Sequence, residues 1–97
     1  MPKGYIIFTE DIRDQAGIDA YASKAIPSLM QAGGRVVVAD PAPVVLEGEW
    51  HGPMTIVLEF DSVDAARAWY ESDDYQAIRG ERLAAADSKG ALLAGFG

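Results

Sequence analysis

The chain has 97 residues, of which 49% are hydrophobic; this length suits a single domain over residues 1–97, and the composition is too apolar for disorder. Fifteen acidic and eight basic side chains give a net charge of −7, which argues against nucleic acid as a partner. The absence of cysteine excludes disulfides and thiolate chemistry, and short apolar runs without a signal-peptide pattern predict a cytoplasmic protein that does not enter membranes.

The first third of the chain predicts a strand followed by a helix. Residues 3–9 are rich in aromatic and β-branched types, which are typical of a strand. Glu10, Asp11 and Asp14 then lead toward a helix, whose positive N-terminal end favours negative charge. From Ile18 onward, apolar residues recur with the i, i+3, i+4, i+7 spacing of one helical face. We expect Pro27 to kink or divide this helix, and a Gly-Gly pair to end it.

The middle of the chain predicts two strands around a turn-rich segment. Residues 35–39 are β-branched and predict the second strand, which the Asp-Pro-Ala-Pro turn of residues 40–43 ends. Residues 44–47 are expected to return as a short strand extension. After a Trp-His-Gly-Pro loop, residues 54–60 give the strongest strand pattern of the sequence.

The last third predicts two helices and a weak strand. Asp61 or Ser62 is a suitable N-cap for a helix over residues 63–71. A Ser-Asp-Asp break then precedes a further helix over residues 75–86. Residues 90–96 predict the final strand.

This order, β-α-β-β-α-β, is that of an α+β ferredoxin-like fold, in which helices cover one face of a four-stranded antiparallel sheet. Strand residues at even positions should face the helices: Ile6, Phe8, Val36, Val38, Ile56, Leu58 and Phe60. Those at odd positions mix apolar and polar types: Tyr5, Ile7, Thr9, Arg35, Val37, Ala39, Thr55, Val57 and Glu59. The mixed face is too apolar for bulk water, so we expect a second subunit to cover it.

An ordered series of short motifs resembles the domain-of-unknown-function family numbered thirteen-thirty, in the dimeric α/β-barrel superfamily. The series comprises Lys3-Gly4-Tyr5, Gly33-Gly34-Arg35, Leu46-Glu47-Gly48-Glu49-Trp50, Ile56-Val57-Leu58-Glu59-Phe60, Ala68-Trp69-Tyr70-Glu71-Ser72 and Tyr75. The resemblance implies a homodimer whose two sheets form a barrel with the helices outside. The superfamily includes cofactor-independent monooxygenases, muconolactone-type isomerases, haem-degrading enzymes and proteins without demonstrated activity, so it implies the fold more than the chemistry.

Two groups of residues are candidates for catalysis. His51 is the only histidine, the residue type that most often serves as a general acid or base, and it is a candidate for that role; the alternative is an exposed loop histidine. Haem-degrading relatives carry their iron-ligating histidine on a helix, whereas His51 lies in a loop, so haem is not expected. Arg35 and Glu59 could bind an anionic substrate and move a proton, although we favour a structural ion pair that fixes subunit register.

Aromatic residues are the remaining candidates. The predicted substrate-binding residues are three of these aromatic residues and one arginine: Tyr5, Trp50, Tyr75 and Arg35. The alternative is that they form core, as aromatic residues at helical spacing more often do. Tyr75 shares a helical face with Arg79 and Arg82, which could clasp a carboxylate; we favour pairing of these arginines with surface acids.

The sequence leaves two functions open. The first is a cofactor-independent enzyme, monooxygenase-like or isomerase-like, that acts on a small apolar or aromatic substrate. The second is a non-catalytic homodimeric module for ligand binding or interaction. No nucleotide-binding fingerprint occurs, and one histidine without cysteine cannot form a histidine-rich metal centre, so neither cofactor nor metal is expected. The expected partners are a second copy of the chain and a small molecule.

Overall fold

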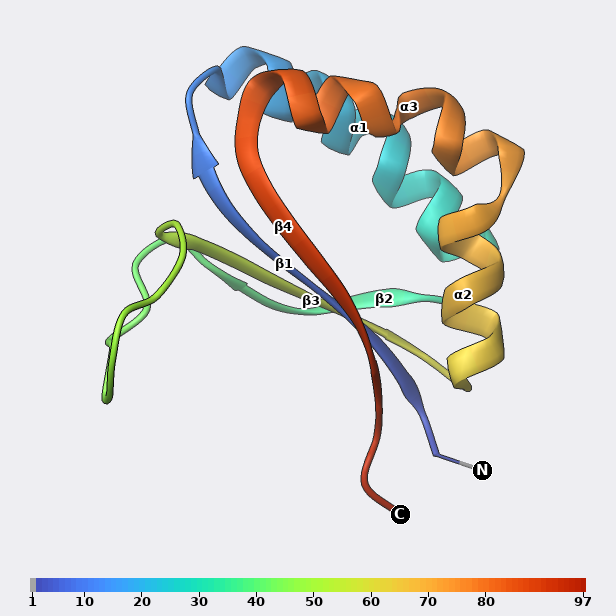
Figure 1. The fold of residues 1–97 in the computed structure, drawn as a ribbon. Helices are drawn as coiled ribbons and strands as arrows, with labels where there is room; N and C mark the ends of the chain where they lie inside the picture. Colours follow the sequence, from blue (N-terminus) through green and yellow to red (C-terminus); the bar gives the residue numbers. More distant parts are fainter. Residues whose placement is uncertain (1) are drawn as a thin grey trace.

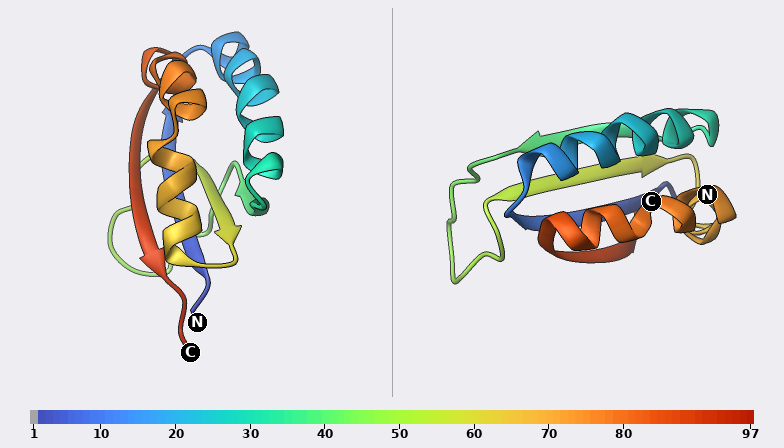
Figure 2. Two further views of the ribbon diagram at one scale, coloured as in Figure 1. Left: turned by 90° about the vertical axis from the view of Figure 1, so that its right-hand side faces the viewer. Right: turned by 90° about the horizontal axis from the view of Figure 1, so that it is seen from above.

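The computed structural model describes residues 2–97 and has the element order β-α-β-β-α-α-β. The elements are β1 (Gly4–Ile12), α1 (Gln15–Gln31), β2 (Arg35–Asp40), β3 (Met54–Phe60), α2 (Val63–Glu71), α3 (Asp73–Ala85) and β4 (Ala86–Ala94). The strands form one antiparallel sheet in the order β2-β3-β1-β4. The helices cover one face of it, with α1 and α3 side by side (Figures 1 and 2). This arrangement confirms the predicted ferredoxin-like fold.

Helix α1 begins at Gln15, before the predicted apolar spacing and after Glu10 and Asp11, which lie in β1; it ends at the predicted glycine pair and is not divided. Asp14 is the N-cap, and its carboxylate accepts a hydrogen bond from a first-turn amide. The helix then continues through Pro27 to Gln31, so the expected division is wrong. Pro27 has no backbone N–H, so the carbonyl of Ser23 lacks its usual amide partner. Both residues are exposed, and water can satisfy that carbonyl. Gly33 ends the helix in the left-handed conformation, with φ of 80°.

Ser72 lies between α2 and α3 and forms hydrogen bonds with both helices. Its backbone N–H donates to the carbonyl of Trp69 at the end of α2, at 3.2 Å. Its hydroxyl accepts a hydrogen bond from the N–H of Tyr75 in the first turn of α3, also at 3.2 Å. Ser62 caps α2 in the same way, since its hydroxyl accepts from the N–H of Ala65 at 3.0 Å. Ser62 is thus the cap of the two that the sequence offered, and Ser72 of the predicted break caps α3, which begins at Asp73 rather than at residue 75.

The two longest strands extend beyond their predicted ends. β1 reaches Ile12 rather than residue 9, and β4 begins at Ala86 rather than residue 90. The extra residues pair with each other, Asp11 with Asp87 and Ile12 with Ala86. α3 passes into β4 without a loop, so no turn residue marks the start of that strand. The pairing joins residues far apart in the chain, and the local sequence pattern does not reveal it.

Residues 41–53 form a loop between β2 and β3 that projects from one end of the sheet (Figure 1). The expected strand extension at residues 44–47 is wrong, because these residues form no strand. Val44 and Leu46 are instead among the most exposed apolar side chains of the described chain.

The core lies between the sheet and the helices. The predicted even-numbered residues Ile6, Phe8, Leu58 and Phe60 are buried there, which confirms most of the alternation. They pack with helix residues including Leu29, Ala66, Trp69 and Tyr75.

A β-bulge in β2 reverses the alternation at its end. β2 has one more residue than β3 between Val36 and Val38, so Val38 pairs with Val57. The next pair is Ala39 with Ile56. Because paired residues share a face of the sheet, Val38 lies on the outer face and Ala39 faces the helices. The prediction placed these two residues the other way round and is wrong for both.

Candidate functional site

Three predicted site residues meet on the outer face of the sheet. Arg35, Glu59 and Tyr5 are cross-strand neighbours on β2, β3 and β1. The Tyr5 hydroxyl donates to Glu59 Oε2 at 2.8 Å, and Arg35 Nε donates to Glu59 Oε1 at 2.7 Å. The hydrogen bond from Tyr5 and, after it, the guanidinium of Arg35 lower the pKa of Glu59. This carboxylate is therefore held ionised by two donors from its own chain.

His51 lies between a hydroxyl and a carboxylate at the other end of the same face. Its Nδ1 is 2.8 Å from Thr9 Oγ1, and its Nε2 is 3.4 Å from Asp87 Oδ2. The histidine side chain is 23% exposed, so it is not the open loop residue of the alternative interpretation. A hydroxyl, an imidazole and a carboxylate in this order are the parts of a base-activated nucleophile, but the buried Nε2 forms no hydrogen bond with the carboxylate.

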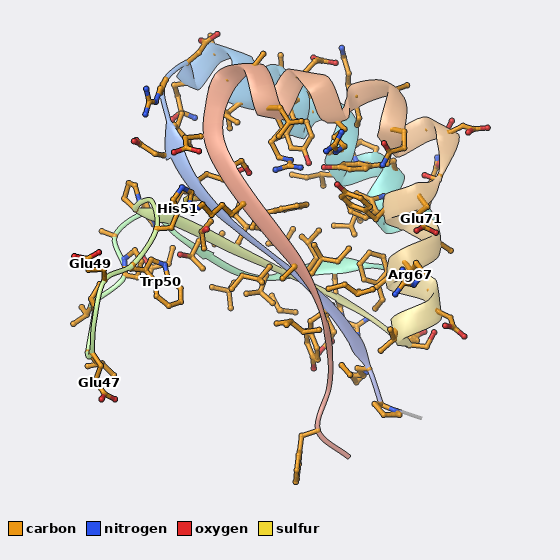
Figure 3. All side chains as sticks on the ribbon, viewed as in Figure 1. Glu47, Glu49, Trp50, His51, Arg67 and Glu71 are labelled. Carbon is orange, nitrogen blue, oxygen red and sulfur yellow. The ribbon has the colours of Figure 1, made fainter. Side chains whose placement is uncertain are left out.

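Trp50 fixes the loop that carries His51. The indole N–H donates to Thr55 Oγ1 at 2.9 Å, and Thr55 is buried although it lies on the outer face. Gly52 brings the loop backbone against β1: its φ is 65°, and a Cβ added there would lie 2.8 Å from the amide nitrogen of Asp11. Figure 3 shows Trp50 and His51 on this loop, far from Arg67 on α2.

The outer face therefore holds two separate groups of predicted site residues. The row of Ile7 and Val57, paired between β1 and β3, lies between the Tyr5–Glu59 pair and the Thr9–Thr55 pair. Tyr75 belongs to neither group. It is fully buried on the helix side of the sheet, and its hydroxyl is 2.8 Å from that of Tyr21.

A buried polar network on the helix side escaped the sequence analysis. Glu10 is 2% exposed and Arg82 is 3% exposed, although Arg82 was expected at the surface. Arg82 Nε donates to the Tyr75 hydroxyl at 3.2 Å, and Arg82 Nη1 donates to the Ser88 hydroxyl. The preferred surface pairing of Arg82 is therefore wrong. Its planar group instead lies over the ring of Phe8, 4.1 Å from the ring centre.

Glu10 is the acidic member of this network. The Ser88 hydroxyl lies 3.4 Å from Glu10 Oε2 and can donate to it. Burial raises the pKa of Glu10, and the charge of Arg82 and the Ser88 hydrogen bond offset that rise in part. The only sequence signal for Glu10 is its even position, which it shares with the buried residues Ile6 and Phe8.

A cavity of about 620 Å³ opens between α1 and the β2–β3 half of the sheet. α1 packs on α3, and the helix-facing side of β2 is left open, with Val36 42% exposed. The walls are mainly apolar and include Phe8, Ile18, Leu29, Ile56, Leu58 and Trp69. Glu10 and Tyr21 add polar groups to this wall. Burial, and next the neighbouring hydroxyl of Tyr75, raise the pKa of Tyr21, so it stays a neutral donor.

A second cavity, of about 420 Å³, lies on the other side of Phe8, and Arg82 and Ser88 line it. The polar network thus stands between two cavities. Within residues 2–97, no three His, Asp or Glu side chains gather in a way that could hold a metal ion. None of the described helices combines the length and apolar character needed to cross a membrane.

An antiparallel sheet in the order β2-β3-β1-β4, covered by helices on one face, defines a ferredoxin-like protein. Residues 3–96 match the family model described as "Domain of unknown function (DUF1330)", and the chain belongs to this family. This match confirms the resemblance seen in the sequence motifs. None of the curated proteins matches the chain.

Solved structures support the same fold. A protein of unknown function from Rhodopseudomonas palustris has a TM-score of 0.80 at 20% identity, covering 99% of this chain and 84% of that one. SnoaB, a cofactor-independent oxygenase from Streptomyces nogalater, has a TM-score of 0.58 at 14% identity, covering 99% and 93%. A dimeric ferredoxin-like protein of unknown function from Thermobifida fusca has a TM-score of 0.53 at 16% identity, covering 96% and 91%.

Proposed function

We propose that the chain is a cytoplasmic homodimeric enzyme that works without a tightly held cofactor. Its substrate is a small apolar or aromatic molecule that occupies the cavity between α1 and the sheet and exchanges a proton with Glu10. The observation that carries this proposal is a buried carboxyl group in the wall of an otherwise mainly apolar cavity. Buried titratable groups that line a cavity are frequent at catalytic sites.

The surroundings of Glu10 suit proton transfer. Burial favours its neutral form and so raises its pKa toward the working pH, where a carboxyl group can both accept and donate a proton. The Tyr21 hydroxyl lines the same cavity and can donate a hydrogen bond to a substrate oxygen that gains negative charge. Removing a proton from an activated O–H or C–H group is a first step that oxygenase and isomerase chemistry share, and SnoaB shows only that the fold can support the former.

His51 and Glu59, predicted as catalytic residues, line neither of the cavities on the helix side. Glu59 already accepts hydrogen bonds from Tyr5 and Arg35, which favours the structural ion pair over a role in proton transfer. His51 keeps a hydroxyl and a carboxylate within reach and stays a second candidate base. The variants His51→Ala and Glu10→Gln separate the two sites.

The homodimer rests on the outer face of the sheet. Ile7, Val57 and Val38 form an apolar row there, and the exposed Val44 and Leu46 extend the apolar surface along the loop. A second copy packed on this face would bury both regions. The similarity in fold to the dimeric Thermobifida fusca protein supports a second copy of the chain as the partner.

The test combines ligand binding and turnover. Naphthols, hydroxyquinones and neutral aromatic compounds are screened by thermal shift, and the products of compounds that bind are analysed by mass spectrometry. Ala39→Phe should fill the cavity and abolish the shift, whereas Ala84→Phe, on the exposed side of α3, should not. Glu10→Gln should keep binding and lower turnover by roughly 100-fold or more.

Equal binding to the Ala39→Phe variant would contradict the cavity assignment. Full turnover by Glu10→Gln, with loss in His51→Ala, would move the chemistry to the outer face. Binding without turnover of any compound would favour the non-catalytic module.

A further inference from the structure

Three arginines converge on the cavity of about 420 Å³ between α2, α3 and β4. Arg67, Arg79 and Arg82 line it, in a chain that has only eight basic residues and a net charge of −7. One carboxylate, that of Glu71, also lines the cavity and lies 3.7 Å from Arg67. The remaining two arginines make this cavity a positive site in an acidic protein.

Arg79 and Arg82 form no ion pair with a carboxylate of the described residues 2–97. Arg79 Nε donates to the Tyr70 hydroxyl at 2.9 Å, and Arg82 donates to the hydroxyls of Tyr75 and Ser88. These neutral acceptors orient both guanidinium groups, and Glu10 reaches Arg82 only through the Ser88 hydroxyl, without an ion pair between them. Burying a cation in this way is costly unless an anion neutralises it, and Arg82 is 3% exposed.

The rest of the cavity wall can hold an apolar group. Ile6, Phe8, Leu83 and Leu92 line it beside the arginines. Gly90 on β4 also lines the cavity, and a Cβ at this position would lie 2.8 Å from Phe8 Cε1. The glycine therefore lets the ring of Phe8 lie flat along the wall, beneath the guanidinium of Arg82.

We propose that this cavity binds a small organic carboxylate. The carboxylate group lies between Arg79 and Arg82, which present N–H groups in the fork geometry that carboxylates accept, and the apolar part of the ligand rests against Phe8 and Leu92. The site is distinct from the cavity beside α1 and does not depend on proton transfer by Glu10.

Sodium benzoate is the probe, with benzyl alcohol as its uncharged counterpart. Binding to the full chain is followed by amide chemical shifts in NMR and by calorimetry, at low and at high salt. Benzoate should shift the amides of residues 79–83 and 88–92, should bind more weakly at high salt, and should bind at least tenfold more tightly than benzyl alcohol.

Arg79→Gln, a partly exposed position, should weaken benzoate binding roughly fivefold or more, and Arg82→Lys should do the same where circular dichroism shows a folded chain. Arg13→Gln removes the same charge from an exposed side chain outside the cavity and should leave the affinity unchanged. Ala39→Phe should also leave it unchanged, which separates this site from the proposed active site.

Three results would overturn the proposal: no benzoate binding at millimolar concentration, equal affinity for benzyl alcohol, or full affinity in Arg79→Gln. Binding of phenyl phosphate without binding of benzoate would overturn the carboxylate assignment.

Discussion

The hydroxyl of Tyr5 donates to the carboxylate of Glu59 at 2.8 Å, from one strand to the next across the outer face of the sheet. The same carboxylate accepts from Arg35, so one side chain ties β1, β2 and β3 together. The two donors explain why the pKa of Glu59 is low, and they leave little reason for this group to take up a proton near neutral pH.

Tyr5→Phe should raise the pKa of Glu59 toward its ordinary value, because the variant lacks the donor with the largest effect on that carboxylate. A carboxyl group with a lowered pKa stabilises the fold at higher pH, and this contribution is lost as the pH falls through the folded-state value. Carbon-detected NMR titration of the glutamate carboxyl groups measures the pKa directly. Tyr70→Phe is the control and should leave Glu59 unchanged; an unaltered pKa in Tyr5→Phe would contradict the assigned cause.

Glu10→Gln should become more stable relative to the wild type as the pH rises above 4.5. Burial raises the pKa of Glu10 above that ordinary value, so the wild type gains stability from this group at low pH and loses it as the pH rises through the folded-state value. Glutamine does not ionise and shows no such loss. Urea unfolding at several pH values between 4 and 8 measures the difference, and parallel curves would refute the prediction.

Gly52→Ala and Gly80→Ala should have opposite effects on stability. An alanine at position 52 would need a left-handed φ and would press on the backbone of Glu10, so we expect a loss of roughly 1–3 kcal/mol in the free energy of unfolding. Position 80 lies in α3 with open space around it, and alanine there should add about 1 kcal/mol. Denaturant unfolding tests both variants, and equal stability would count against the close contact of the loop with β1.

Ser72→Ala should cost about 1 kcal/mol or more, because one hydroxyl bonds the end of α2 and the start of α3. Ser23→Ala, an exposed position within α1, is the control and should change the free energy of unfolding by less than about 0.5 kcal/mol. Thermal and urea unfolding report both values. A neutral Ser72→Ala variant would show that the helix boundary depends on packing alone.

Val57→Asp should convert the proposed homodimer into single chains, because it places a charge in the centre of the apolar row on the outer face. Met30→Asp changes an exposed apolar residue of α1 and should leave the assembly intact. Multi-angle light scattering at micromolar concentration measures the mass of each. A wild-type protein with the mass of one chain would contradict the dimer outright.

Local sequence patterns predicted most of the fold because strands and helices here follow simple periodicities. The strand over residues 54–60 and the helix over residues 63–71 lie where their patterns place them, and Ser62, one of two predicted N-caps, caps that helix. The errors arise where the limits of an element depend on contacts with a segment far away in the chain. The end of β1 depends on its pairing with β4, and nothing near Glu10 in the sequence indicates that partner.

The candidate sites were predictable only in part. The register of β2 and β3 places Arg35 opposite Glu59, and the two side chains form an ion pair. Arg82 was misplaced because an arginine on an amphipathic helix usually lies in solvent, and only the tertiary fold brings Tyr75 and Ser88 to its guanidinium. Neither cavity has a signal in the local sequence, since each is lined by elements that are far apart in the chain.

The bulge in β2 determines which side chain borders the cavity of about 620 Å³ beside α1. Because the bulge turns Ala39 rather than Val38 toward α1, a small methyl group borders the space there. If β2 paired without the bulge, Val37 would lie opposite Val57 and Val38 opposite Ile56, which would bring an isopropyl group into the same space. Related chains could therefore adjust the room available to a bound molecule by pairing this edge strand with or without the bulge, without repacking the interior.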